Sequence, residues 1–360
     1  MSCILQCTFN SKEMHKFLIV VIMTLVKNAY TESIVGPPCI LNSSNTHGRC
    51  LVPHICRMFE EVPGPGKKLP KYTYCDEKVS EIFLICCPEI YQPGYITENK
   101  CREYASLTKE KQLCRHSVRP GGTANFPHIA LLGYPDRENW LQNQWLCMGA
   151  LISEQYVLTE AHCISHRSEY NVSEPTVVLL GIANGDDTTH RQEIKVSKTI
   201  LHQDPSKKQE IALVKLEKPI EMSSYVRPAC LKAYVDIPVT KVFVTEWHLR
   251  RAARVISKEL IEVTVDVLRE PCNNGSTSPY AQDFHFCTSP HRHGKNRVGS
   301  ALYIFHNNDS TSCMYDIVGV TSKRGQDDQP DLNRRVSYWF IKWIEDEVWP
   351  EEIQPKNLFT

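Results

Sequence analysis

The sequence lacks net charge and, beyond its N-terminal 30 residues, lacks any apolar run long enough for a membrane anchor. Its 41 lysines and arginines balance 41 aspartates and glutamates. Bulk electrostatics therefore favour neither nucleic acid nor an acidic membrane as a partner. We expect no nucleic-acid binding and no membrane anchor.

The CxxC spacing of many metal and redox sites is also missing, although the chain contains 16 cysteines. Their regular placement predicts a disulfide framework made in an oxidising compartment, and cytosolic metal binding is the weaker interpretation. The HRH motif at 291–293 is interpreted as a solvated loop, because metal ligands need further partners at defined distances. We expect no metal and no cofactor.

The N-terminus has the pattern of an exported protein. An apolar run at 17–26 follows two lysines and is too short to span a bilayer comfortably. Residues 1–30 are predicted to be a signal peptide, with Met14 as an alternative start. Processing would remove Cys3 and Cys7 and leave 16 − 2 = 14 cysteines, all of which can pair. The mature protein is predicted to be secreted.

The mature chain opens with a group of six cysteines. These are Cys39, Cys50, Cys56, Cys75, Cys86 and Cys87. Spacing alone leaves about fifteen connectivities open. The spacing, which ends in a CC pair, resembles the clip domain of arthropod haemolymph proteases. The resemblance implies a clip domain at 39–87 with the bridges Cys39–Cys86, Cys50–Cys75 and Cys56–Cys87. A module this small depends on its bridges, each contributing roughly 2–4 kcal/mol.

A polar segment of mixed charge, 88–118, is interpreted as a linker. It contains two isolated cysteines. In clip-domain proteases such cysteines tie the light chain to the catalytic domain. The resemblance implies the pairs Cys114–Cys230 and Cys101–Cys313, and the assignment of these two linker cysteines stays open.

The rest of the chain has an all-β pattern. Short apolar or alternating runs predict strands at 129–134, 150–159, 176–182, 193–202, 210–216, 241–247, 260–268 and 315–322. Turns rich in Gly, Pro and Asn separate them, as in paired β-barrels. Helical spacing at 337–349 predicts a C-terminal helix.

Two segments, LCMGALISEQYVLTEAHC at 146–163 and FCTSPHRHGKNRVGSALYIF at 286–305, resemble trypsin-like serine proteases. The resemblance implies two six-stranded β-barrels with a C-terminal helix over 119–350, followed by a tail at 351–360. It places His162 at the general base. It also implies the bridges Cys147–Cys163 and Cys272–Cys287.

The other catalytic positions depart from the family pattern. Val298 stands at the nucleophile, and valine has no oxygen to form an acyl-enzyme. Glu210 stands at the triad aspartate, whose task is to orient the histidine. Asn296 replaces an oxyanion-hole glycine, and Arg292 stands where an acidic residue would select Lys or Arg. We predict that the chain has no protease activity.

The positions that activate such a protease are altered together. Arg119 begins the segment that replaces the activated N-terminus, and Arg297 replaces the aspartate that the new amino group would bind. Two like charges would meet where an ion pair is needed. Cleavage after Arg115 remains open.

Two nearby serines are interpreted as ordinary surface or strand residues. Taking Ser300 as the nucleophile would shift the alignment with the family motif by two residues, and Leu302 would then no longer match its position in that motif. Ser310 follows an apolar strand. Four sequons predict glycosylation if they are exposed. They are Asn42, Asn171, Asn274 and Asn308.

These features predict a secreted, inactive clip-domain serine protease homologue of an arthropod, which acts through protein contacts. The segments RPACL and CMYDIVGVTS make it similar to the snake-like group. The resemblance implies a role in melanisation or Toll-type immune cascades, as cofactor or regulator, with clip proteases and prophenoloxidase as partners. Alternatives are a decoy that inhibits prophenoloxidase activation, an active trypsin-like endopeptidase, and a module that binds microbial sugars.

Overall fold

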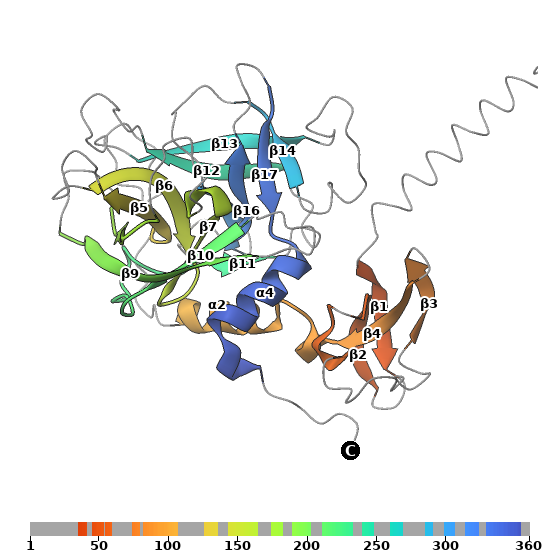
Figure 1. Ribbon diagram of the computed structural model, residues 1–360. Coiled ribbons are helices and arrows are strands. Elements are labelled where there is room, and N and C mark those ends of the chain that lie inside the picture. The colour runs from red at the N-terminus through yellow and green to blue at the C-terminus, as the bar shows by residue number, and fades with distance from the viewer. Residues whose placement is uncertain are drawn as a thin grey trace, which may run out of the picture. The chain divides into compact units, whose positions relative to one another are not determined.

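The computed structural model describes sixteen stretches of the chain (Figure 1). They are residues 35–41, 45–53, 55–59, 74–79, 82–106, 126–135, 143–164, 174–182, 189–202, 211–232, 240–247, 260–268, 285–290, 299–306, 314–323 and 329–353. The chain forms two units, Met1–Gln92 with Ser278–Asp283, and Pro93–Thr277 with Phe284–Thr360. Each unit is described by itself.

The first unit contains a four-stranded antiparallel sheet with the order β1-β2-β4-β3. Its elements are β1 (Val35–Leu41), β2 (Thr46–Leu51), the 3-10 helix η1 (Arg57–Phe59), β3 (Tyr74–Val79), β4 (Ile82–Pro88) and the 3-10 helix η3 (Glu89–Tyr91). The three predicted bridges are confirmed: Cys39–Cys86, Cys50–Cys75 and Cys56–Cys87. They cross-link a module whose apolar core is small.

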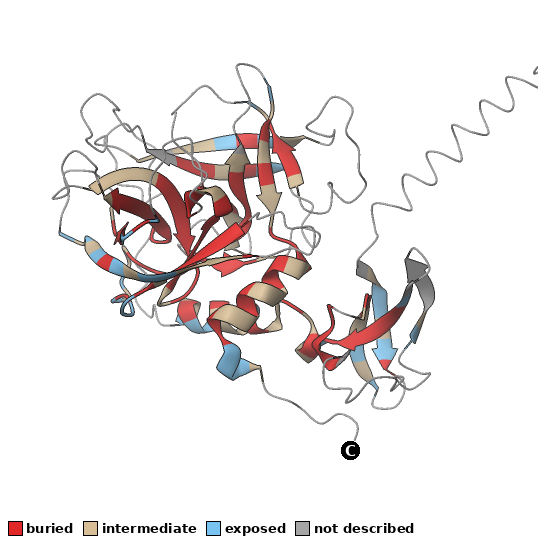
Figure 2. Cartoon of the chain, viewed as in Figure 1, coloured by how far each residue is buried: buried red, intermediate tan, exposed pale blue. Residues whose placement is uncertain are grey.

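The second unit contains a closed barrel whose strand order is β10-β7-β6-β5-β8-β9. Its strands are β5 (Ile129–Pro135), β6 (Asn143–Leu151), β7 (Tyr156–Glu160), β8 (Val177–Leu180), β9 (Gln192–Leu201) and β10 (Ile211–Leu216). Buried residues follow its strands in Figure 2, and its apolar core includes Leu132, Val178 and Ala212. The run predicted as one strand at 150–159 is two strands, because residues 152–155 turn between them.

A second ring of six strands follows, in which β16, β15, β12, β13, β14 and β17 pair in turn and β17 returns to β16. The strands are β12 (Lys241–Trp247), β13 (Leu260–Leu268), β14 (His285–Thr288), β15 (Ala301–Phe305), β16 (Tyr315–Lys323) and β17 (Asp331–Arg335), and β11 (Cys230–Leu231) adds to β16 in parallel. The predicted pair of six-stranded barrels is confirmed. Closing both rings leaves no long unpaired edge among these strands.

Two helices pack together beside the barrels, α2 (Tyr95–Ser106) and α4 (Tyr338–Val348). The predicted C-terminal helix is α4, and the Ser337 hydroxyl caps it by accepting from the Phe340 amide. No helix in the described stretches has both the length and the apolar character needed to cross a membrane.

Helix α2 lies inside the segment that the sequence predicted as a linker. The buried carboxylate of Glu345 in α4 accepts hydrogen bonds from the amides of Gly94 (3.0 Å) and Thr97 (2.9 Å) at the start of α2. A carboxylate stabilises a helix N-terminus by pairing amides that have no partner within the helix. The Tyr104 hydroxyl near the other end of α2 donates to Glu154 at 2.8 Å.

The docking of α2 corrects the predicted disulfides of the linker. Cys101 is bonded to Cys230. The predicted pairs Cys114–Cys230 and Cys101–Cys313 are therefore wrong. The reason is geometric, since α2 packs on β11 and carries Cys101 to its partner. Cys114 and Cys313 lie outside the described residues.

Among the described residues of the second unit, His128 is a buried polar side chain without a hydrogen bond. His128 has no exposed surface, and neither ring nitrogen has a partner in the described structure. Its ring lies against Tyr303 and Tyr315, with centroid distances of 5.0 and 4.7 Å. Burial lowers the pKa of His128 to about 3, because a charged imidazole would lose its hydration there. The folded protein therefore holds this histidine neutral.

We expect His128→Phe to stabilise the protein, by about 1–3 kcal/mol at pH 7.5, because it removes two unpaired buried nitrogens. In the wild type, the unfolded chain binds a proton near pH 6.5 that the folded chain binds only near pH 3. Stability is therefore lost as pH falls through this window, by about 1.4 kcal/mol per pH unit.

The free energy of urea unfolding, measured from pH 7.5 to 4.5, tests this expectation. The His128→Phe variant should lose the part of the pH dependence of the unfolding free energy that comes from His128. Ile129→Val is the control, because it alters packing without removing a titratable group. An unchanged slope in His128→Phe would show that His128 titrates normally in the fold.

Candidate functional site

The candidate site lies where β7 and the turn before β15 meet β16. The 3-10 helix η4 (Ala161–Cys163) follows β7 directly and carries His162. The predicted bridge Cys147–Cys163 is confirmed and links η4 back to β6. The local chain is thus fixed on both sides of the predicted general base.

The turn after the nucleophile position is described from Gly299 onward. Gly299 has φ +81°, and a Cβ there would collide with the Met148 carbonyl oxygen and the Thr159 hydroxyl. Only glycine adopts this conformation readily and also leaves the space empty. The Gly299 amide donates to the Thr321 carbonyl in β16 at 3.0 Å. The residue that follows Val298 is therefore packed against the strand that leads into the His162 helix.

Ser300, the alternative nucleophile, is fully buried. Its hydroxyl donates to the Thr245 carbonyl oxygen at 2.8 Å, and its own carbonyl accepts from the Thr321 amide at 2.8 Å. An acyl acceptor must reach substrate and a base. The geometry instead gives Ser300 a structural role, in agreement with its interpretation as a strand serine.

The structure reveals a buried carboxylate that the sequence analysis missed. Glu160, at the end of β7, accepts a hydrogen bond from the His162 amide and another from the Ser322 hydroxyl at 3.1 Å. The sequence did contain a sign of it, because TEAHC has glutamate where the family motif TAAHC has alanine. Ser322 belongs to β16, so this carboxylate joins the two barrels.

Glu160 does not repeat the arrangement of a catalytic triad. A triad carboxylate hydrogen-bonds the histidine ring and orients it, whereas Glu160 binds the backbone amide of His162. Within the described residues, the ring of His162 has no hydrogen-bond partner. The site thus has the frame of a catalytic centre, and the Glu160 carboxylate pairs with the His162 amide and the Ser322 hydroxyl.

Several predicted positions lie outside the described residues. They are Arg119, Glu210, Arg292, Asn296, Arg297, Val298 and Ser310, and the four sequon asparagines Asn42, Asn171, Asn274 and Asn308. Cys287 is disulfide-bonded. Its predicted partner, Cys272, also lies outside the described residues.

Comparisons with known proteins agree with this fold. The family model described as Trypsin matches residues 117–344. Serine protease snk of Drosophila melanogaster is 28% identical over 260 residues, 65% of this chain and 58% of that protein. Serine protease Hayan, also from Drosophila melanogaster, is 28% identical over 248 residues, 62% of this chain and 37% of that protein. The chain thus spans less than two thirds of the length of these relatives.

A solved structure is similar in fold. It is described as the crystal structure of Drosophila Grass, a clip serine protease of the Toll pathway. It matches with a TM-score of 0.52 and 21% identity, covering 87% of this chain and 97% of that chain.

Glu160→Ala should reduce the free energy of urea unfolding by about 2 kcal/mol. The substitution removes the carboxylate that accepts hydrogen bonds from the His162 amide and the Ser322 hydroxyl. The matched control is Glu174→Ala, which removes an exposed carboxylate that accepts from Thr199. We expect a change within about 0.5 kcal/mol for that control. Equal losses in the two variants would contradict a bridging role for Glu160.

Proposed function

The chain belongs to the trypsin family of serine proteases, and we propose that it is a secreted, catalytically inactive member of the clip type that acts by binding other proteins. The observation that carries this proposal is Val298 at the nucleophile position. A valine side chain has no oxygen or sulfur, so it cannot attack a peptide carbonyl or hold an acyl group. Ser300 offers no replacement, because it is buried and hydrogen-bonded to the backbone.

The contacts of the candidate site support the loss of activity. A general base works when a partner holds its ring in one orientation. The buried carboxylate of Glu160 instead binds the His162 amide and Ser322. This arrangement stabilises the meeting point of the barrels, and it commits the Glu160 carboxylate to partners other than the His162 ring.

The altered activation residues support it as well. Proteases of this family become active when a new N-terminus pairs with an aspartate beside the nucleophile. Here Arg119 and Arg297 stand at the two ends of that contact. A pair of like charges would oppose the change that opens an active cleft.

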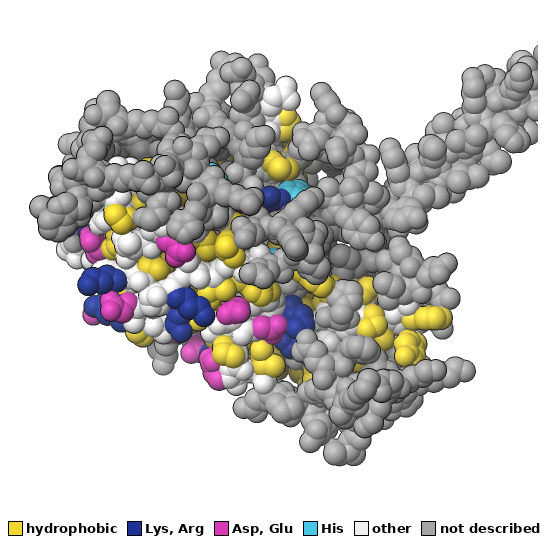
Figure 3. Space-filling model, in the orientation of Figure 1, with side chains coloured by type: hydrophobic (Ala, Val, Ile, Leu, Met, Phe, Trp, Pro, Cys, Tyr) yellow, Lys and Arg dark blue, Asp and Glu magenta, His cyan; other side chains and the backbone are white. Residues whose placement is uncertain are grey.

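What the chain retains is a set of folded surfaces. The first unit keeps the three bridges expected of a clip domain, and the second keeps both barrels. On the face shown in Figure 3, basic and acidic side chains of the described residues are intermixed. A surface without a dominant charge suits specific protein contacts better than nonspecific attraction to a polyanion.

We place this activity in haemolymph protease cascades of the melanisation or Toll type. Support comes from the insect proteases snk and Hayan among the relatives and from the fold shared with a clip protease. The proposed partners are a clip protease and prophenoloxidase, with this protein as cofactor or regulator. As part of the same proposal, we assign the chain to the snake-like group of clip proteases.

The purified protein should not react with a fluorophosphonate probe, whereas an active clip protease in the same tube should. The reason is that Val298 has no hydroxyl group and Ser300 is buried. In-gel fluorescence of the wild type, Ser300→Ala and Ser310→Ala measures this. Labelling of the wild type that disappears in Ser310→Ala would identify an active serine endopeptidase and overturn the proposal.

Adding the protein to prophenoloxidase and its clip protease should increase phenoloxidase activity. The assay compares the intact protein, the protein cut in the linker, and an Arg115→Gln variant that resists cutting at that residue. A rise only with cut protein would show that cleavage exposes the binding surface. A fall in activity would identify a decoy inhibitor, and no change in any form would remove prophenoloxidase activation as its role.

A further inference from the structure

Two lysines face each other on the outside of the barrel formed by β5–β10. Strands β9 and β10 are antiparallel, and their register places Lys198 directly opposite Lys215. Val214 and Leu216, which flank Lys215, belong to the apolar core, so Lys215 points outward and Lys198 points with it. Like charges directly opposite each other on neighbouring strands destabilise a sheet. The pair therefore lowers the stability of this sheet unless an anion lies between the two lysines.

A β-bulge adds a third lysine to the same face. The pairing of β9 with β10 shifts register after Lys215, so that Ser197 is an extra residue in β9. The Ser197 hydroxyl fastens the bulge by donating to the Lys215 carbonyl oxygen at 3.1 Å. On a regular strand, residues three positions apart point to opposite faces. With the bulge, Lys195 follows the core residue Ile194 and points outward, as Lys198 does.

We call Lys195, Lys198 and Lys215 the lysine patch. Lys195 and Lys198 are exposed and Lys215 is half-buried, and Figure 2 shows exposed residues along β9. The Lys215 ammonium lies 5.4 Å from the centre of the Tyr156 ring, which attracts the cation but leaves its charge in place. Within the described ranges, no carboxylate forms an ion pair with any lysine of the patch. The patch therefore keeps three positive charges on one outer face.

We propose that the lysine patch binds an acidic segment of a partner protein. This inference rests on the proposed function, because it names the chemistry of the partner. Carboxylates placed between the lysines would neutralise the repulsion that the sheet now carries. Strand β9 is already paired with β8 and β10 along its two edges. The acidic segment therefore binds through its side chains and not by adding a strand.

The size of the lysine patch fits an extended peptide. Neighbouring strands lie about 4.8 Å apart and a strand rises about 3.3 Å per residue, so the patch measures about 5 by 10 Å. An extended peptide places side chains on one side at every second residue, about 7 Å apart. Two carboxylates at alternate positions of the peptide can therefore contact all three lysines.

The surroundings of the patch favour a peptide over a uniformly charged polymer. Two exposed carboxylates lie beside it: Glu174 accepts from the Thr199 hydroxyl at 2.6 Å, and the Glu217 amide donates to the Lys195 carbonyl at 2.9 Å. A sulfated glycan or a nucleic acid that crosses the patch would meet these like charges, whereas a peptide can place a neutral or basic residue there. The chain also has no net charge to attract a polyanion over long distances.

Binding of a fluorescein-labelled peptide with alternating aspartate and serine residues tests the inference. Fluorescence anisotropy measures its affinity for the full mature chain at about 50 mM salt. We expect Lys198→Gln with Lys215→Gln to weaken binding about 10-fold, and added salt to weaken wild-type binding by screening. The matched control is Lys232→Gln with Lys241→Gln, which removes two charges elsewhere in the second unit and should leave the affinity within about 2-fold.

Lys198→Glu separates binding from damage to the fold. The new carboxylate lies opposite Lys215 and turns a repulsive pair into an attractive one, so the urea midpoint of unfolding should rise. Peptide binding should nevertheless be lost, because the variant carries a negative charge at the centre of the patch. A lower midpoint in Lys198→Glu would contradict the repulsion from which the inference starts.

The remaining outcomes distinguish this inference from the proposed function. Equal peptide binding by the wild type and Lys198→Glu would overturn the inference. Tighter binding of a heparin fragment of equal charge, also lost in Lys198→Glu, would assign the patch to a polyanion instead. In the phenoloxidase assay, full stimulation by Lys198→Glu would remove the patch as the partner's surface and leave the proposed function in place. A wild type that binds the peptide but does not stimulate phenoloxidase would overturn the proposed role and keep the binding site.

Discussion

The closure of two six-stranded rings by backbone hydrogen bonds is the constraint on which the second unit depends. Each strand is paired on both sides, so the registers fix where β7, β15 and β16 end. These ends bring the His162 helix and the Gly299 turn together. The hydrogen bonds between these strands involve main-chain atoms only. They therefore form equally well with a serine or a valine at the nucleophile position. Under the proposal that the chain is inactive, this explains physically how the frame of a catalytic centre can persist without the chemistry.

Under the proposed loss of activity, the buried polar groups of the site are free to serve packing. Glu160 illustrates this change, because its carboxylate accepts from both a backbone amide and a side-chain hydroxyl across the two barrels. Ser300 does the same on a smaller scale by donating to the Thr245 carbonyl. A buried polar group that is fully paired stabilises one arrangement, whereas a catalytic group must keep some of its hydrogen-bonding capacity for substrate.

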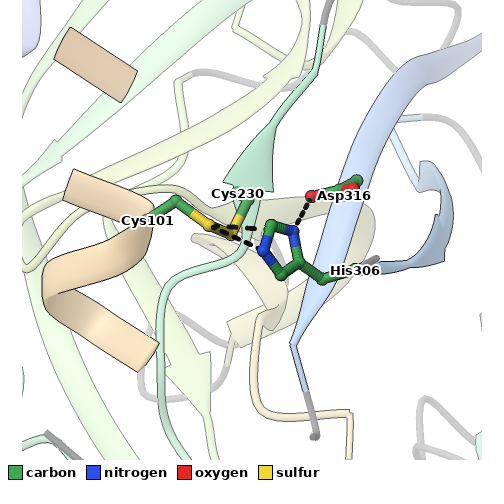
Figure 4. Close-up of side chains that lie close together, drawn as sticks. All are labelled: Cys101, Cys230, His306 and Asp316. Carbon is green, nitrogen blue, oxygen red and sulfur yellow. Dashed lines mark hydrogen bonds and ion pairs between the residues drawn. A yellow bond between two sulfur atoms is a disulfide. The ribbon is translucent and has the colours of Figure 1, made fainter. Parts of the chain in front are cut away.

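Helix α2 shows how a polar segment becomes part of a folded unit. It has few apolar side chains, and isolated helices of 12 residues are marginal in water. Several different interactions hold it in place, among them the Glu345 cap at its start, the disulfide at Cys101 and the hydrogen bond from Tyr104. The His306–Asp316 pair lies directly against that disulfide (Figure 4), so residues of β16 and of the end of β15 lie beside the point where α2 is bonded to β11.

The sequence by itself determined many of the barrel strands, the C-terminal helix and the bridges of the first unit. Strand periodicity is local, and the spacing of the first six cysteines matched a known pattern that the disulfides confirm. Only the tertiary structure decided the course of residues 95–106, the partner of Cys101 and the role of Glu160. The apolar content of α2 is too low for the sequence to predict a helix there. Cys101 and Glu160 contact partners that lie 129 and 162 positions away in the sequence. Contacts over such separations follow from how the barrels close and where α2 docks, and no local pattern in the chain encodes them.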